Sequence, residues 1–536
     1  MPSFDLLTEL WIPVLDAGTD LREQPDAPAS PREVGLREAL LRAHELREVA
    51  AGSPLQTIAL YRLLLALAID VYQPKPNTET WATLWRAGRF DIAPLDAYLA
   101  RLPHRGGEFD LLHPTRPFFL NPERDASQKK KDPAPLAKLF HDRASGNNAT
   151  LFDHAVDSQP MKLSLAEAAR GVVATQASAL GGGVSKPFNF SHAPLVGRLQ
   201  FWIRGRSLFE ALILNAPPDD EARMGARTDA PSWRASLPDA YRKRTQRGLL
   251  DVLTWPARRI TLVTEEHNAT LGATGVYLTQ GDKLEPQPLD DPLAAYVTSK
   301  KGTYPLGLRA GRALWRDATV LMRITDAESE RAPLTFRWAM AFAPFEVPDH
   351  ADELDALFRT NGADAFGLVN DQAKSELWRH VRFPLYRSIF TDADRQATLK
   401  RALDAAENQL TDKKKGLRPA VRVVGDFALA PPAPGDDAYP SSDSKAVSAL
   451  AHSLGAEPRY WAALETPFFL FLEGLADADT PDARTTVLDD WHRAVYLAAE
   501  GAFDAATASF DTDARHLRAV AKGRARLRPV VSLQAS

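Results

Sequence analysis

The chain has 536 residues, with 65 Lys and Arg against 69 Asp and Glu, and a formal net charge of −4. A single hydrophobic core stops growing at roughly 250 to 300 residues, so the length predicts more than one domain. The net negative charge excludes nucleic-acid binding through overall charge, so any such contact must be local or shared with partners. The absence of cysteine excludes disulfides, thiolate nucleophiles and cysteine-ligated metal centres.

The N-terminal part of the sequence predicts mixed α/β structure. Residues 4–14 are expected to include a short strand that ends at Pro13. Ser53 and Pro54 form an N-cap with proline in the first helical turn, and they predict a buried helix over 55–72. Short runs rich in Val, Ile, Thr and aromatic residues then predict antiparallel strands, namely 198–203, 260–263 and 334–343.

After residue 370 the pattern changes to long helical periodicity with abundant alanine. Helices are predicted over 372–386, 392–410, 444–454, 459–475, 481–510 and 512–527. Successive amphipathic helices with short loops are typical of an antiparallel bundle. The predicted fold class is α+β: a large mixed α/β domain with short antiparallel sheets over 1–390, followed by a C-terminal four-helix bundle over 391–536.

Targeting signals are not predicted. The start of the chain carries Asp5 and Glu9 and lacks the basic and apolar regions of a secretory signal. The longest apolar run, 63–69, falls short of the roughly 20 residues that span a bilayer. We therefore expect a soluble, cytoplasmic protein that does not bind a membrane.

Motifs for catalysis are also missing. The glycine run Gly181–Gly183 lacks the Gly-Lys-Ser/Thr ending of a nucleotide-binding loop. Asp489, Asp490 and His492 are adjacent on a predicted helix and point in different directions, so they do not predict a metal site. We predict no enzyme, no cofactor and no metal; an enzyme with a site assembled from distant residues is a remote alternative.

Several basic clusters occur along the chain, and for most of them a solvated surface is the expected role. They are Lys129–Lys131, Arg242–Arg244 with Arg247, Arg258–Arg259, Lys300–Lys301, Lys413–Lys415 and the stretch from Arg515 to Arg528.

The order and spacing of several short segments resemble the CasA family, the large subunits of type I-E CRISPR surveillance complexes (Cascade). The matching segments include Asp5–Val14 (DLLTELWIPV), Arg116–Phe119 (RPFF), Leu180–Gly183 (LGGG), Lys300–Gly302 (KKG) and Asn370–Ala373 (NDQA). The resemblance implies a subunit that recognises the protospacer-adjacent motif (PAM) of double-stranded target DNA through the minor groove and promotes R-loop formation. The implied partners are the backbone and small Cascade subunits, the guide crRNA, target DNA and a nuclease-helicase.

Three DNA-reading elements follow from this resemblance. The first is the glycine loop, in which Gly182, flanked by Gly181 and Gly183, would approach the groove floor because no Cβ intervenes. The second is a wedge formed by Gln372, with Asn370 and Asp371 in the same turn at a helix start. The third is Lys283, on a hairpin turn formed with Gly281 and Asp282.

Two further regions are implied. Phe152, Asp153 and His154 would belong to a loop beside the guide handle, and Lys300 and Lys301 would touch duplex phosphates. Some relatives carry cysteines that look capable of binding zinc; this chain has none, so no metal is carried over.

The sequence also departs from the family pattern beside the wedge. Val369 stands where a basic residue is expected, and Asp371 is acidic where many relatives have an amide. Asp371 would otherwise serve as a helix N-cap. These departures keep an alternative open, a scaffold subunit that binds guide RNA and protein partners without reading DNA.

Overall fold

The computed structural model describes most of the chain. The described residues are 2–18, 30–73, 77–124, 131–141, 143, 161–182, 190–218, 229–234, 242–267, 269–285, 291–322, 330–371, 374–429, 443–510 and 513–531. Contacts divide the chain into two compact units. The first comprises 1–310 and 324–385, and the second comprises 311–323 and 386–536. The sequence prediction had placed one boundary at 390 and did not foresee that 311–323 joins the second unit.

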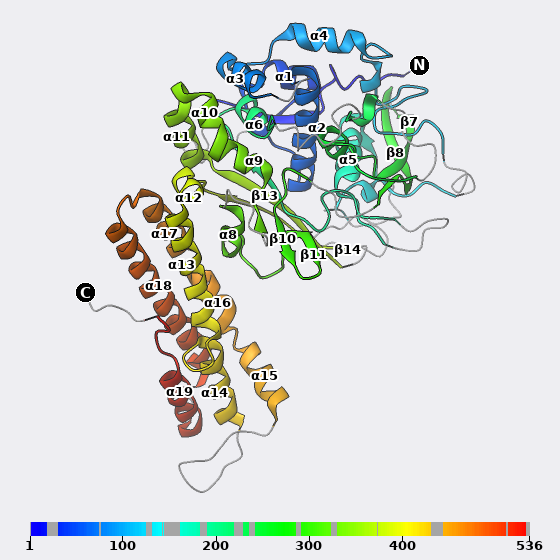
Figure 1. Cartoon of the computed structure of the whole chain (residues 1–536). Helices are drawn as coiled ribbons and strands as arrows, with labels where there is room; N and C mark the ends of the chain where they lie inside the picture. The colour runs from blue at the N-terminus through cyan, green and yellow to red at the C-terminus, as the bar shows by residue number, and fades with distance from the viewer. Residues whose placement is uncertain are drawn as a thin grey trace. The chain divides into compact units, whose positions relative to one another are not determined.

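The first unit is a mixed α/β structure (Figure 1). Its strands are β1 (Ile12–Asp16), β2 (Arg32–Val34), β3 (Leu46–Val49), β4 (Leu163–Ser164), β5 (Gln200–Ile203), β6 (Arg242–Arg244), β7 (Arg258–His267), β8 (Thr270–Gln280), β9 (Asp282–Leu284), β10 (Tyr296–Ser299), β11 (Gly302–Pro305), β12 (Glu330–Arg331), β13 (Ala363–Asp371) and β14 (Lys374–Phe383). Its helices include α1 (Leu36–Leu41), α2 (Pro54–Tyr72), α3 (Thr78–Ala87), α4 (Ile92–Arg101), α5 (Leu165–Ser178), α6 (Leu208–Leu214), α7 (Leu249–Leu253), α9 (Leu334–Arg337), α10 (Ala343–Glu346) and α11 (Ala351–Asn361).

The described strands form small sheets, in agreement with the predicted fold class. The three-stranded sheets have the orders β2-β1-β3, β11-β10-β12, β14-β13-β5 and β4-β8-β7, and β6 pairs with β9 in a two-stranded sheet. The three-stranded sheets are antiparallel, whereas the β6–β9 pair is parallel.

Helix α2 is the core of the first unit. Ser53 caps it as predicted, because its side chain accepts a hydrogen bond from the Gln56 amide. The helix has the length and hydropathy of a membrane span, but 94% of that window is buried inside the protein. The buried guanidinium of Arg62 lies in this helix and contacts Asp291 (2.7 Å), Gln200 (2.7 Å) and the Val252 carbonyl (3.0 Å). These bonds tie α2 to segments about 140 to 230 residues away in sequence.

The second unit consists of packed helices, and here too the fold class agrees with the prediction. They are α8 (Ala318–Leu321), α12 (Arg387–Thr391), α13 (Ala393–Thr411), α14 (Leu417–Leu429), α15 (Ser444–Ser453), α16 (Ala456–Ala463), α17 (Glu465–Asp477), α18 (Pro481–Thr507) and α19 (Ala514–Arg526). Trp315, from the inserted segment 311–323, stacks on Phe468 at 4.7 Å and meets Trp461 and Trp491 edge-on. This aromatic cluster explains why that segment belongs to the helical unit.

Several predicted elements are wrong in type or extent. Residues 372–386 were expected to be helical, but β14 occupies 374–383. Residues 334–343 were expected to be a strand and instead form α9 and a π-helical turn over Trp338–Phe342. Helix α14 was missed, and the predicted helix 459–475 is split into α16 and α17. In and just after β14, apolar residues at 377, 381 and 385 recur every four residues and imitate a helix face, but pairing with β13 overrides that pattern.

Replacing Arg62 with leucine should destabilise the first unit by about 3–5 kcal/mol, because the buried Asp291 carboxylate would lose its partner. Urea denaturation followed by hydrogen exchange of α2 peptides measures the loss. Arg42→Leu is the matched control, since the ion pairs of Arg42 with Glu38 and Glu45 are half exposed, so solvent screens them and their loss should change stability little. Equal effects of the two substitutions would contradict the role assigned to Arg62.

Candidate nucleic-acid interface

The glycine loop begins and ends on two segments joined by backbone hydrogen bonds, the first of which starts in the last residues of α5. We call residues 177–182 and 190–195 the stalk. Its ladder of backbone hydrogen bonds runs from the Leu195 amide to the Ala177 carbonyl (2.8 Å), the Ala193 amide to the Ala179 carbonyl (2.9 Å), and the Gly182 amide to the Phe190 carbonyl (2.9 Å). Gly183 and the following residues to 189 lie outside the described residues. The ladder holds the two ends of the loop beside each other.

Both described glycines of the loop are required by the backbone. A Cβ on Gly181 would lie 2.6 Å from the His192 nitrogen and 2.9 Å from the Phe190 carbonyl oxygen, so no side chain fits. Gly182 has a φ of +107°, in the region that favours glycine. Turn geometry is therefore one sufficient reason for these glycines, alongside the close approach to DNA that the resemblance implies.

A buried arginine joins the two halves of the stalk. The guanidinium of Arg258 donates to the carbonyls of Leu180 (2.8 Å) and Ser191 (2.8 Å), one on each side of the loop, and its plane lies over the Phe190 ring at 4.7 Å. Arg258 is 3% exposed and makes no ion pair with a carboxylate among the described residues. Burial lowers the pKa of Arg258 to about 9, so it stays charged at neutral pH. The expectation of a solvated Arg258–Arg259 surface is wrong, because both side chains are buried.

Two buried glutamines complete the base of the stalk. Gln176 accepts a hydrogen bond from the Arg258 amide (2.8 Å) and donates to the Arg258 carbonyl (2.9 Å). Gln280 accepts from the Ser191 amide at 2.7 Å. Both side chains are 3% exposed, so their amides replace the water that the backbone would otherwise bind.

His192 supports the first glycine of the loop. Its Nδ1 accepts a hydrogen bond from the Gly181 amide at 2.9 Å, which requires the neutral ring with its proton on Nε2. Burial lowers the pKa of His192, and the positive charge of Arg258 lowers it further. The neutral ring is therefore the form that the folded stalk prefers.

The wedge residues lie at the end of a β-hairpin and not at a helix start. Strands β13 and β14 are antiparallel, and their last paired residues are Asp371 and Lys374. Gln372 lies between them in sequence and outside the described residues. The alternative role of Asp371 as a helix N-cap is wrong because its backbone belongs to β13. Asn370, partly buried, pairs with Ser375 in the same hairpin.

A small apolar cluster packs the wedge hairpin against the stalk. Leu368 of β13 is buried with Leu55 and Val196, and Leu180 and Trp378 pack against them. Leu180 immediately precedes Gly181, and Trp378 is the cross-strand partner of Leu368. Two elements that are almost 190 residues apart in sequence thus share one packed base.

Lys283 lies on a strand, so the predicted hairpin turn at 280–283 is wrong. Gly281 separates β8 from β9, and β9 pairs in parallel with β6 so that Lys283 lies opposite Lys243. A Cβ on Gly281 would lie 2.2 Å from the Pro256 carbonyl, which explains this glycine by close packing. Leu284, the next residue, packs with Ala193 and Ala179 of the stalk in a second apolar cluster. Lys283 is therefore also anchored to the stalk.

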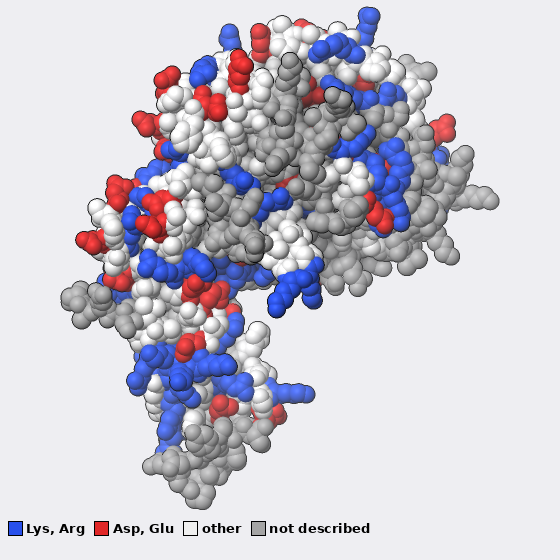
Figure 2. Space-filling view, in the orientation of Figure 1, with Lys and Arg blue, Asp and Glu red and all other residues white. Residues whose placement is uncertain are grey.

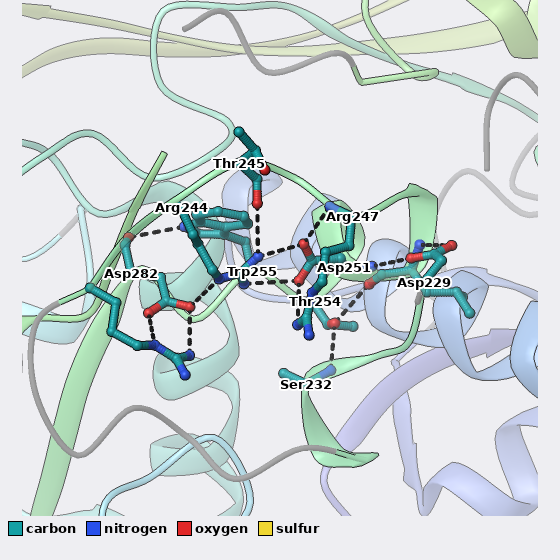
Figure 3. A network of polar contacts seen from close by, with 11 residues as sticks. Asp229, Ser232, Arg244, Thr245, Arg247, Asp251, Thr254, Trp255 and Asp282 are labelled. Atoms are coloured by element: carbon teal, nitrogen blue, oxygen red, sulfur yellow. Dashed lines mark hydrogen bonds and ion pairs between the residues drawn. The ribbon is translucent and has the colours of Figure 1, made fainter. Parts of the chain in front are cut away.

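A network of buried ion pairs holds β9 in place (Figure 3). The fully buried Asp282 carboxylate accepts from Arg242 (2.8 Å) and Arg244 (2.5 Å). Arg244 also pairs with Asp251 at 2.6 Å and covers the Trp255 ring at 3.9 Å. In this basic cluster, Arg242 and Arg244 therefore contribute to structure, and the exposed Lys243, on the other side of the strand, pairs with Glu285 at 3.0 Å.

Lys300 and Lys301 form the turn between β10 and β11, as the KKG motif predicts. Ser299 pairs with Gly302, the first residue of β11, whose φ of +125° lies in the region that favours glycine. Both lysines are exposed. The third predicted region, Phe152, Asp153 and His154, lies outside the described residues.

The sequence profile of the family described as CRISPR-associated protein Cse1 matches residues 5–502. The chain belongs to the Cse1 family. The resemblance to the CasA family seen in the sequence is thereby confirmed, since the two names describe one family. The Cse1 family is non-catalytic, in agreement with the prediction that the chain is not an enzyme.

Individual relatives of this Cse1 chain match along almost its whole length. The CasA/Cse1 protein of Thermus thermophilus is 30% identical over 543 residues, covering 98% of this chain and 96% of the relative. The crystal structure of Thermus thermophilus CasA matches with a TM-score of 0.74 at 27% identity, covering 98% of both chains. Cse1 from Acidimicrobium ferrooxidans, at 21% identity and a TM-score of 0.75, shares the fold over 98% of this chain and 97% of its own. A chain of a CRISPR RNA-guided surveillance complex also shares the fold, with 23% identity, a TM-score of 0.70, and coverage of 98% and 99%.

Sequence reasoning missed the residues that position the loop: Arg258, Gln176, Gln280 and His192. The one available signal was the polar side chain of Gln176 within the apolar stretch 172–177, which indicates a buried polar group. The described residues contain no group of three or more His, Asp or Glu side chains arranged to hold a metal ion.

Replacing Arg258 with methionine should loosen the stalk, because the carbonyls of Leu180 and Ser191 would be left without their donor. We expect at least a roughly tenfold rise in amide exchange at Gly182, measured by NMR or mass spectrometry. Arg258→Lys keeps the charge but loses the second nitrogen that bonds the Ala257 carbonyl and the planar group over the Phe190 ring, so it should also loosen the stalk. Unchanged exchange in both variants would contradict the assignment.

The Gly181–His192 bond should weaken in acid. The pKa of His192 lies below the ordinary value of 6.5, so the unfolded chain binds the proton more readily than the folded stalk. The stabilisation is therefore complete above pH 6.5 and is lost as pH falls through the lowered pKa. The Gly181 protection factor, corrected for intrinsic exchange, should fall below pH 6.5 in the wild type and remain constant in His192→Asn, which does not titrate. The same fall of the Gly181 protection factor in the wild type and in His192→Asn would contradict this role of His192.

Proposed function

We propose that this Cse1 chain is a subunit of a CRISPR RNA-guided surveillance complex and reads the PAM of double-stranded DNA. Two things support this: the family, and the surveillance complex that contains a chain of the same fold. The observation that carries the proposal is the shared base of Leu180, Leu368 and Trp378, which brings the glycine loop and the wedge hairpin together. One DNA duplex could contact both the glycine loop and the wedge hairpin without a large rearrangement of either.

The roles of the elements follow from their chemistry. Gly181, Gly182 and Gly183 would bring backbone groups to the floor of the minor groove, which is about 6 Å wide. Gln372, between the paired ends of the hairpin, would enter the stack and displace the first base pair beyond the motif, at a cost of a few kcal/mol. Lys283 would reach into the minor groove, Lys300 and Lys301 would contact phosphates, and the positive charge of Arg258 lies just beneath the loop.

The remaining partners belong to the same proposal. Phe152, Asp153 and His154 would contact the guide handle of the crRNA, and the helical unit would contact the small Cascade subunits. The first unit would help recruit the nuclease-helicase after the R-loop forms. The scaffold alternative is favoured by Val369 and Asp371, because an acidic residue beside the wedge repels phosphate.

Gln372→Ala and Gly182→Asp should each weaken PAM-dependent duplex binding by the reconstituted complex at least tenfold, or about 1.4 kcal/mol. Gel shifts with duplexes that carry or lack the motif measure this effect. Gly18→Asp, at an exposed glycine with open space around it, is the matched control and should bind like the wild type.

A duplex with the first pair beyond the motif already mismatched separates the two roles. It should restore binding to Gln372→Ala, because opening that pair no longer needs the wedge, but it should not rescue Gly182→Asp. If both variants assemble and bind matched duplex like the wild type, the loops are structural and the scaffold function holds.

A further inference from the structure

A helical segment of the first unit carries an unusual turn. It consists of α9, a π-helical turn over Trp338–Phe342, α10 and α11. Pro344 follows the wide turn directly; proline cannot donate to a helix, and its ring clashes with the carbonyl four residues earlier. The turn buries Trp338 through Ala341 and leaves Phe342 on the surface. Such π-turns recur at functional sites.

Two phenylalanines of this segment are exposed. Phe342 is 50% exposed and Phe345 is 74% exposed, and they are the two phenylalanines among the large exposed apolar side chains of the described residues. Residues three apart in a helical stretch lie on the same side, so the two rings form one apolar surface. A single exposed apolar residue needs no explanation, but adjacent aromatic rings are typical of binding surfaces.

One of the exposed rings, Phe342, packs against a rigid aromatic base. Trp85 stacks on Trp81 at 5.6 Å, Trp81 meets Trp338 edge-on at 5.4 Å, and Trp338 stacks on Phe342 at 6.3 Å. The Trp81 indole is fixed in turn by a hydrogen bond to the Ile213 carbonyl (2.9 Å). A ring held in this way loses little conformational entropy when a partner binds.

Three carboxylates follow these rings closely in the sequence. Glu346, Asp349 and Asp352 make no ion pair within the part of the chain that the structure describes, whereas the neighbouring Glu353 is already paired with Arg206 and His350. Figure 2 shows Asp and Glu side chains gathered over the edge of the first unit where α10 and α11 lie. The nearby Arg86 donates to the Glu346 carbonyl and not to its carboxylate. The segment that carries the rings therefore has three carboxylates whose charge no ion pair among the described residues offsets.

We propose that the aromatic-acidic surface, comprising Phe342, Phe345, Glu346, Asp349 and Asp352, docks a segment of another protein that alternates basic and apolar residues. Apolar side chains of the segment would cover the rings, and its Lys or Arg groups would pair with the carboxylates and lie over the exposed ring faces. Nucleic acid and anionic lipid are disfavoured because their phosphates would be repelled by these carboxylates. This surface uses none of the proposed DNA-reading residues, so its function is separate from DNA reading.

The test uses the full chain and a fluorescein-labelled peptide of alternating leucine and lysine, followed by fluorescence anisotropy. Phe345→Ala should lower the affinity for this peptide at least about fivefold, and the double variant Asp349→Asn/Asp352→Asn should do the same with a reduced salt dependence. Because Phe345 is mostly exposed, its substitution should leave the thermal midpoint unchanged.

Controls distinguish the surface from general attraction to a negatively charged protein. Leu497→Ser, at an exposed leucine of α18, and Glu9→Gln, at an exposed carboxylate, should bind the peptide like the wild type. Equal binding by all variants, or an equal loss in the controls, would overturn the proposal. So would a concentration-dependent dimer in sedimentation velocity that Phe345→Ala abolishes, since the occupant would then be a second copy of the chain.

Discussion

The guanidinium of Arg258 is the interaction on which the candidate interface depends. It donates hydrogen bonds to carbonyls on both sides of the glycine loop. The side chain of Gln176 in turn bonds the backbone of Arg258. Burying a cation away from carboxylates is costly, and here carbonyl oxygens and the Phe190 ring replace its water. The result is a loop whose two ends cannot separate without uncovering a charge. A loop fixed in this way at its base is already ordered there before any ligand arrives, which lowers the entropic cost of binding.

Two small apolar clusters extend this support to the neighbouring elements. One joins Leu180 to Leu368 and Trp378 of the wedge hairpin, and the other joins Ala179 and Ala193 to Leu284 beside Lys283. Burying each large apolar side chain contributes about 1.5–3 kcal/mol, enough to fix the base of a loop. The stalk is thus the common support of three elements that are far apart in sequence.

Charge is distributed unevenly over this chain. A net charge of −4 is therefore compatible with the proposed contact with nucleic acid. Many arginines form ion pairs within the protein. Arg242 pairs with Asp282, and Arg244 pairs with Asp282 and Asp251. Under the proposed function, the exposed lysines at the β10–β11 turn would contact phosphates, and the half-buried Lys283 on β9 would reach the minor groove. The carboxylates of the aromatic-acidic surface lie instead around Phe342 and Phe345, on different elements. Separate surfaces of opposite charge would let the two proposed partners, a nucleic acid and a basic protein segment, bind one chain without competition.

The sequence by itself determined those features that depend on residues close together in the chain. Ser53 and Pro54 determined the start of α2, the KKG motif determined the β10–β11 turn, and alanine-rich periodicity determined the helical unit. Long-range pairing was decided only in the tertiary structure. The β13–β14 pairing turned a helix-like pattern into a strand, and parallel pairing with β6 turned the expected turn at Lys283 into β9. Likewise, Arg258 looks like a surface residue until the stalk, which is some 70 residues earlier, closes over it. Local capping and turn preferences are contained in the adjacent residues, whereas burial and strand pairing depend on partners that only the folded chain brings together.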